Sequence, residues 1–120
     1  MPIQLYEEDG GKILIVQVSG KLTKEDYAGF VPVFERLADL HGKLRVMFDL
    51  AGFHGWEASA AWEDVKFAAK HFADIERLAV VGDKKWQRGL AAFGRPFTQA
   101  KLRYFNQADA GQARAWLGTA

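Results

Sequence analysis

A chain of 120 residues, of which 49% are hydrophobic and 26% charged, has the size and composition of one globular domain. Sixteen basic and fifteen acidic residues leave a net charge of +1, so no overall field would attract nucleic acid. The chain has no cysteine, which excludes disulfides, thiolate metal sites and cysteine nucleophiles. It shows neither a signal peptide nor an apolar run of about 18 residues, so we expect a cytoplasmic protein with one domain over residues 1–120.

The first two strands are predicted to form a hairpin. A short strand that opens at Ile3 leads to residues 9–11, whose Asp-Gly-Gly sequence is a strong turn signal. The residues from Lys12 to Ser19 then alternate in hydrophobicity, as a half-buried strand does, and Gly20 is expected to end this strand.

A helix and a buried strand are predicted next. Thr23, with an acid three residues later, indicates a helix N-cap. Proline costs about 3 kcal/mol inside a helix, so we expect a short opening turn and a main helix that restarts with Pro32 in its first turn. Gly42 is expected to end this helix in the left-handed conformation. The apolar run Leu44–Leu50 predicts a strand with both faces covered.

The second half of the chain predicts two further strands and three helices. Helices are expected over Ser59–Phe72, over Lys84–Phe93 and after a cap at Asp109, with strands over Arg77–Val81 and Ala100–Phe105. The element order is then ββαβαβαβα. This order predicts a single α/β domain with a mixed sheet, whose antiparallel part is the N-terminal hairpin.

Aromatic and basic side chains gather at one predicted edge of the sheet. The strand Leu44–Leu50 is expected to stop in a glycine-bracketed aromatic loop, Gly52–Trp56, at the carboxyl edge where open α/β sheets bind ligands. The expected ligand-binding residues are Phe53, Trp56, Trp86, Leu90, Phe93 and Phe97, with Lys84, Lys85 and Arg88 at the rim. An apolar stripe edged with bases is typical of a membrane-surface or anionic-amphiphile site. The alternative is that the stripe on Lys84–Phe93 simply packs on the sheet.

The same edge offers carboxylates and a histidine for a small hydrolytic or isomerising enzyme. Asp49 and Asp83 follow neighbouring strands, and His54 lies in the aromatic loop. The alternative is that Asp49 accepts hydrogen bonds from loop N–H groups and Asp83 caps the next helix. No third ligand has metal-binding spacing with these acids, and no nucleotide-binding or nucleophile motif is present, so we expect no metal, no cofactor and no catalysis. His41 and His71 lie near helix ends, where a structural role is expected.

Three stretches carry a resemblance to a known family: GKLTKEDYAGFVP, FDLAGFHGWEASAAWEDVKF and LAVVGDKKW. Together with the element order they resemble the SpoIIAA-like proteins, which have the fold of the STAS domain, over about Ile3 to Leu117. The resemblance implies a curved four- or five-stranded mixed sheet with helices packed mainly on one face. It also implies that a mobile helix pair binds apolar ligands or associates with membranes.

Better understood members of this fold are protein-partner switches, the anti-sigma-factor antagonists. They carry a phosphorylated serine in an Asp-Ser pair, and the matching place here reads Glu57-Ala58-Ser59. Ser59 is therefore a candidate phosphosite at a helix N-terminus, although a capping role already explains it.

The sequence thus favours a non-enzymatic binding or regulatory protein. Its expected partner is a lipid-like molecule or a membrane surface, which would place the protein peripherally at the inner membrane. The alternatives are a protein-partner switch and the small enzyme. A homodimer stays open, and nucleic acid is not expected as a partner.

Overall fold

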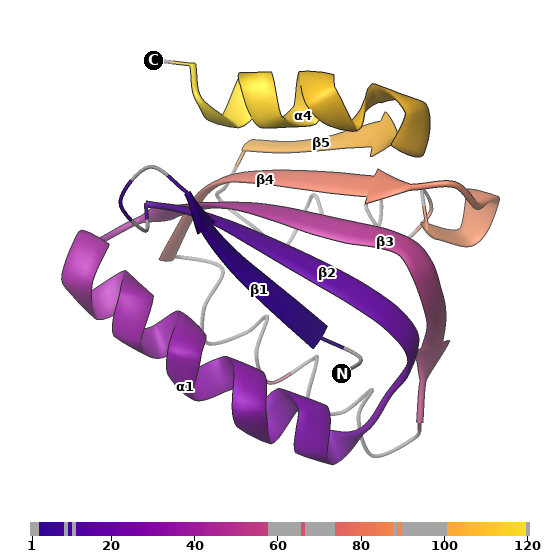
Figure 1. Ribbon diagram of the computed structural model, residues 1–120, viewed down its shortest axis with the longest axis horizontal. Helices are drawn as coiled ribbons and strands as arrows, with labels where there is room; N and C mark the ends of the chain where they lie inside the picture. Colours follow the sequence, from indigo (N-terminus) through magenta and orange to yellow (C-terminus); the bar gives the residue numbers. More distant parts are fainter. Residues whose placement is uncertain are drawn as a thin grey trace.

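The computed structural model describes residues 3–8, 10, 12–57, 66, 74–87, 89 and 101–119, without the side chain of Trp56. Its strands form one five-stranded sheet in the order β1-β2-β3-β4-β5 (Figure 1). The strands are β1 (Ile3–Glu8), β2 (Ile13–Leu22), β3 (Leu44–Trp56), β4 (Ile75–Gly82) and β5 (Lys101–Asn106). β1 runs antiparallel to β2, and every other neighbouring pair is parallel. The predicted α/β fold with a mixed sheet and an N-terminal hairpin is confirmed.

The first helix, α1 (Lys24–His41), begins as predicted but does not break at Pro32. The Thr23 Oγ1 accepts from the Asp26 N–H at 3.3 Å, and the Thr23 N–H donates to the Asp26 carboxylate at 2.8 Å, which is a complete capping box. The expected restart at Pro32 is wrong, because this residue lies inside one continuous helix. Its ring lies on the exposed side of α1, while Phe34 on the inner side is fully buried and holds the helix on the sheet. Gly42 ends the helix with a positive φ of 74°, as expected for a glycine cap, but its ψ of −135° lies outside the expected left-handed helical region.

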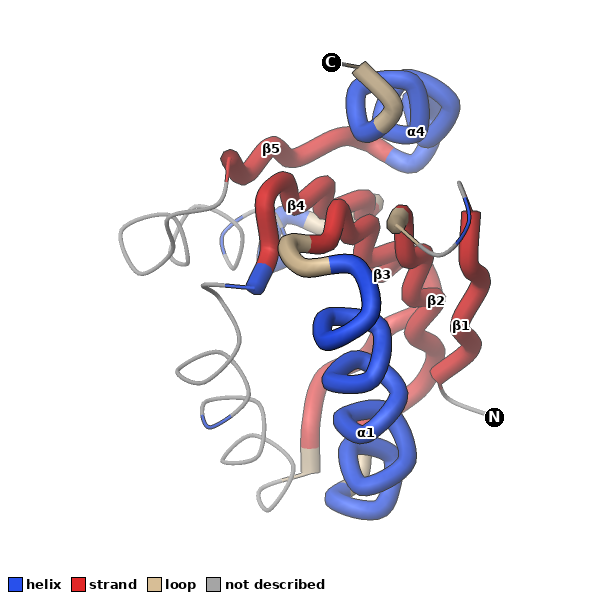
Figure 2. Tube along the Cα trace, turned by 90° about the vertical axis from the view of Figure 1, so that its left-hand side faces the viewer, coloured by secondary structure: helices blue, strands red, loops and turns tan. Residues whose placement is uncertain are grey.

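The two described helices cover opposite faces of the sheet. Figure 2 shows α1 on one side of the strands and α4 (Ala110–Leu117) on the other. The core under α1 is large and includes Phe34, whereas the core under α4 is smaller and includes Met47. Asp109 takes the N-cap position of α4 but makes no capping hydrogen bond, because it ends a 3₁₀ turn and lacks the extended backbone of a capping residue.

The strands β3 and β4 form the buried centre of the sheet, as the apolar runs predicted. Every residue of β4 except Glu76 is buried, and on β3 the side chains of Val46 and Met47 are buried on opposite faces. Their parallel register pairs Val46 with Leu78 and Asp49 with Val81. Both faces of this pair are therefore closed to solvent, which explains the absence of polar alternation.

Two predicted helices fall largely outside the described residues. Of the helix expected over Ser59–Phe72, only residue 66 is described, and it has a helical backbone. Of the helix expected over Lys84–Phe93, residues 85–87 and 89 are helical. Within the described part of the chain, no helix is both long and apolar enough to cross a membrane.

Candidate functional site at the carboxyl edge

The aromatic loop expected at Gly52–Trp56 is wrong, because these residues continue β3. They pair with an equally extended β2, in which Gly20 lies opposite Phe53 and Leu22 lies opposite Trp56. Two register shifts accommodate the extension, and each places an extra residue on β3, between Asp49 and Gly52 and between Phe53 and Gly55. Gly20 and Gly55, which flank the second shift, have positive φ angles of 65° and 118°. The strand thus persists beyond the glycines because a neighbouring strand supplies hydrogen-bond partners.

At this edge β3 is still paired with β2 but no longer with β4. The pairing of β3 with β4 ends at Asp49 and Val81, whereas the pairing of β3 with β2 continues to Trp56. The chain leaving β4 turns at Asp83 and Lys84 into the helical residues 85–87. The candidate site lies where the end of β3 meets this helical turn.

Phe53 and Trp86 form the aromatic pair of the site. Their ring centroids lie 5.5 Å apart with an interplanar angle of 45°. Phe53 is only 1% exposed and belongs to the core under α1, whereas Trp86 is 40% exposed. Of this pair, Trp86 therefore supplies the accessible surface and Phe53 supports it from below.

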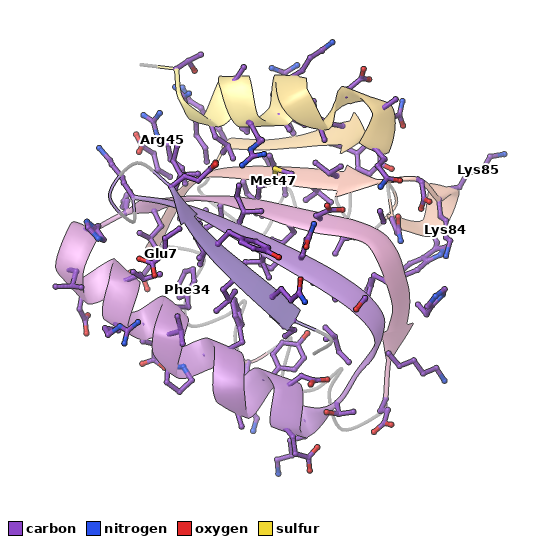
Figure 3. All side chains as sticks on the ribbon, in the orientation of Figure 1. Glu7, Phe34, Arg45, Met47, Lys84 and Lys85 are labelled. Carbon is purple, nitrogen blue, oxygen red and sulfur yellow. The ribbon has the colours of Figure 1, made fainter. Side chains whose placement is uncertain are left out.

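Two lysines precede Trp86 at the rim. Lys84 is half-buried and Lys85 is exposed, and Figure 3 shows both side chains extending outward beyond the end of β4. Neither lysine forms an ion pair with a described residue. The turn therefore combines an exposed indole with two positive charges that no acid among the described residues pairs with.

Gln87 is a structural element of the site that the sequence analysis missed. Its side chain is fully buried, and its Nε2 donates to the backbone oxygens of Leu50 at 2.6 Å and Phe53 at 3.3 Å. Its Oε1 accepts from the backbone N–H groups of Asp83 at 3.0 Å and Lys84 at 3.4 Å. A glutamine three residues after a helix N-cap is a known signal for this backward contact to the helix start. The Asp-Lys-Lys-Trp-Gln sequence carried that signal.

The three residues of the enzyme alternative do not form a connected constellation. The Asp49 carboxylate accepts the Ala51 N–H at 3.1 Å, which is the structural role considered for it. His54 and Asp83 are both exposed, and no hydrogen bond or ion pair joins the side chains of Asp49, His54 and Asp83. The N–H of Asp83 is bound by Gln87, and that glutamine satisfies the start of the helical turn in place of the expected Asp83 cap. Among the residues that are described, no group of three metal-ligating side chains occurs.

The remaining predicted site residues fall outside the described side chains. They are Trp56, Arg88, Leu90, Phe93 and Phe97 of the expected ligand site, and Ser59 of the expected phosphosite.

Comparisons with known proteins agree with this architecture. A SpoIIAA-like family model matches residues 13–118. A crystal structure of an uncharacterized protein with a SpoIIAA-like fold from Shewanella loihica PV-4 is similar at 28% identity and a TM-score of 0.79, covering 96% of this chain and 91% of that one. The unphosphorylated anti-sigma factor antagonist SpoIIAA is similar at 11% identity and a TM-score of 0.61, covering 94% of this chain and 97% of that one. No curated protein matches the chain. Because the family model spans most of its length, the chain belongs to the SpoIIAA-like family.

Proposed function

We propose that this protein is a non-enzymatic binding protein that takes an amphiphile with an anionic head group at the carboxyl edge of its sheet. The observation that carries the proposal is the exposed ring of Trp86, which rests on the buried Phe53 and follows Lys84 and Lys85 directly. An indole supported from below offers an apolar surface to an acyl chain. Lysines at its rim offer positive charge to a phosphate or carboxylate head group.

The chemistry of the site supports binding better than catalysis. Asp49 is engaged with the Ala51 N–H, and His54 has no hydrogen-bonded acid or nucleophile beside it among the described residues. A general base needs a partner or an orienting group within hydrogen-bond reach. We therefore expect Asp49→Asn to leave the affinity for any amphiphile unchanged.

Vesicle binding tests the proposal. We expect vesicles containing phosphatidylglycerol, or the free amphiphile dodecanoate, to change the tryptophan emission, and Trp86→Ala to remove most of that change. Phosphatidylcholine vesicles should have a weaker effect, and added salt should weaken the phosphatidylglycerol effect, because exposed charges are screened over about 10 Å in 0.1 M salt. The double variant Lys84→Gln/Lys85→Gln should lose the preference for phosphatidylglycerol.

A matched control is Lys101→Gln, because Lys101 is also exposed but lies at the start of β5. Its substitution should leave vesicle binding unchanged. If neither phosphatidylglycerol vesicles nor dodecanoate alters the emission of the unmodified protein, the proposal fails. Binding to vesicles but not to free dodecanoate would identify a membrane surface, and so a peripheral membrane protein, as the source of the head group.

A protein-partner switch is the second candidate, and the similarity of fold to an anti-sigma factor antagonist supports it. In that case Ser59 would take the place of the phosphorylated serine and a phosphate there would control a protein partner. Native mass spectrometry of the protein purified from its own cells distinguishes the candidates, because it measures bound amphiphile, bound protein, phosphorylation and dimerisation separately. A phosphate lost in Ser59→Ala, with no bound amphiphile, would favour the switch.

A further inference from the structure

Gln87 occupies the position that a neighbouring strand would take beside β3. The Leu50 and Phe53 carbonyls that it binds belong to the part of β3 that has already lost β4 as a partner. Unpaired buried carbonyls destabilise a fold, and an open strand edge invites pairing with other chains. The Gln87 amide therefore completes the hydrogen bonding of β3 where the sheet itself no longer does.

The same side chain fixes the start of the helical turn. Through its Oε1 it holds the N–H groups of Asp83 and Lys84, and through its Nε2 it holds β3, so one amide joins the two segments. Trp86 is the adjacent residue in this turn, and its ring lies against Phe53, whose carbonyl Gln87 binds. The hydrogen-bonded contact between the turn and β3 thus lies next in sequence to the exposed indole and shares Phe53 with it.

We propose that Gln87 is the positioning residue of the site, which holds Trp86 on Phe53 and so preforms the apolar surface before a ligand arrives. The expected effect of Gln87 on ligand affinity rests on the proposed function. The role of Gln87 in placing the Trp86 ring does not. Preforming a site raises affinity because no ordering cost is left for the binding step.

At neutral pH, glutamine is the side chain of this length that has the required hydrogen-bonding groups. The strand side needs a donor for two carbonyls and the turn side needs an acceptor for two N–H groups, and glutamine offers both. The space is also specific, because a Cβ at Gly82 would lie 2.5 Å from the Gln87 Oε1 and 3.0 Å from the Tyr104 hydroxyl. Gly82 therefore provides the room in which the amide turns toward β3.

The first experiment measures the placement of Trp86 without any ligand. The protein is labelled with 5-fluorotryptophan, which gives four fluorine positions, and Trp86→Phe identifies the resonance of Trp86. In Gln87→Met, a substitution of similar length without the amide, we expect the Trp86 resonance to move toward its position in urea. The other three resonances should keep their native positions.

Gly82→Ala is an independent variant that displaces Gln87 without changing its chemistry, and it should move the same resonance. Gly29→Ala is the matched control, because nothing lies within 4 Å of a Cβ added at Gly29. Gln87→Glu adds a readout that a merely structural role would not produce. Its carboxylate faces two carbonyls at neutral pH, and acidification should restore the native Trp86 resonance because a protonated carboxyl can donate again.

An unchanged Trp86 resonance in folded Gln87→Met or in folded Gly82→Ala overturns the inference. If Gln87→Met does not fold, Gly82→Ala and the pH response of Gln87→Glu decide the question in the same way.

The second experiment measures affinity for phosphatidylglycerol vesicles by sedimentation. We expect Gln87→Met to bind about tenfold more weakly than the unmodified protein, as the loss of a preformed site predicts. Unchanged affinity with a displaced Trp86 resonance would refute the role of Gln87 in binding. If the unmodified protein does not bind the vesicles, the proposed function fails and the fluorine spectra alone decide whether Gln87 positions Trp86.

Discussion

Arg45 and Arg77 face each other on the neighbouring strands β3 and β4, and both donate to backbone carbonyls at the C-terminal end of α4. The Arg45 Nη1 lies 2.6 Å from the Leu117 oxygen, and the Arg77 Nη1 lies 2.8 Å from the Trp116 oxygen. Both guanidinium groups also bind the backbone oxygen of Thr119. The last carbonyls of a helix have no intrahelical partners and carry partial negative charge. The two arginines, which are paired across β3 and β4, therefore donate hydrogen bonds to the carbonyls at the C-terminal end of α4 and neutralise their charge.

Removing Arg77 should destabilise the protein strongly. Arg77 is 8% exposed, and Arg77→Met would remove the charged donor of the Trp116 carbonyl and one of the two charged donors of the Thr119 carbonyl, while retaining most of the apolar stem. We expect a loss of about 2–3 kcal/mol in the free energy of unfolding, measured with urea. The control is Arg103→Met: Arg103 is exposed and stacks on Phe105 and Trp116, so its loss should cost less than about 1 kcal/mol. Equal effects of the two substitutions would contradict this role of Arg77.

The pair of Glu76 and Arg45 should make stability depend on acid pH. The hydrogen bond from Arg45 at 3.2 Å, aided by positive charge nearby, holds the pKa of Glu76 below its ordinary value of 4.5. Because the folded-state pKa is the lower one, the stabilisation is complete above pH 4.5 and is lost as the pH falls through the folded-state value. Glu76→Gln should therefore be less stable than the unmodified protein at pH 7 and should lose less stability on acidification. The difference should stay below about 1 kcal/mol, because the Glu76 side chain is 43% exposed.

Urea titrations at pH 7 and pH 3 measure this effect. The control is the same substitution in an Arg45→Met background, where the difference between glutamate and glutamine should become smaller, because Lys12 and Arg77 supply the remaining positive charge. A difference of unchanged size there would show that Arg45 does not cause the pH dependence.

Replacing Pro32 should stabilise the protein. The ring lies on the exposed side of α1, so its removal leaves no cavity, and an alanine N–H could donate to the carbonyl of Ala28 one turn earlier. We expect Pro32→Ala to raise the free energy of unfolding by as much as about 3 kcal/mol. Gly29→Ala, at another exposed position of the same helix, serves as the reference. It should raise the free energy of unfolding by about 1 kcal/mol. A lower melting temperature for Pro32→Ala would show that the proline has a role that its exposure does not reveal.

A charge in the centre of the sheet should prevent folding. Val46 is fully buried in the core under α1, and Val46→Asp would place an unpaired carboxylate there at a cost of several kcal/mol. That cost is comparable to the whole stability of a domain of this size. Circular dichroism should show an unfolded or aggregated Val46→Asp protein, whereas Gln17→Asp, at an exposed position of β2, should unfold cooperatively. A cooperative transition in Val46→Asp would refute the central position of β3.

Local patterns predicted most of the fold. Short-range or burial rules that act within a few residues account for the capping box at Thr23, the positive φ of Gly42 and the apolar run of β4. The extension of β3 to Trp56 could not be found in this way. It depends on the pairing of Gly20 with Phe53, which are distant in the chain, and isolated glycines otherwise indicate a loop.

The candidate site was predicted only in part. Phe53 and Trp86 were expected at one edge and do meet there, because parallel strands bring their carboxyl ends together. Phe53 is buried and Trp86 is exposed. This difference depends on how β3 and β4 twist and where each of them ends, which the amino-acid composition does not reveal. Gln87 was missed because a polar residue on an amphipathic helix is ordinarily assigned to solvent.

The strand order of the sheet, which follows the order of the chain, has a consequence for synthesis on the ribosome. Each new strand can pair with the one just made, so β2, β3 and β4 can assemble before the rest of the chain emerges. Among the described residues, however, the face that carries Ile15, Met47 and Val81 is covered by α4, which follows all five strands in the sequence. The nascent sheet therefore exposes an apolar face until α4 has left the exit tunnel, and this interval is when a chaperone would bind it.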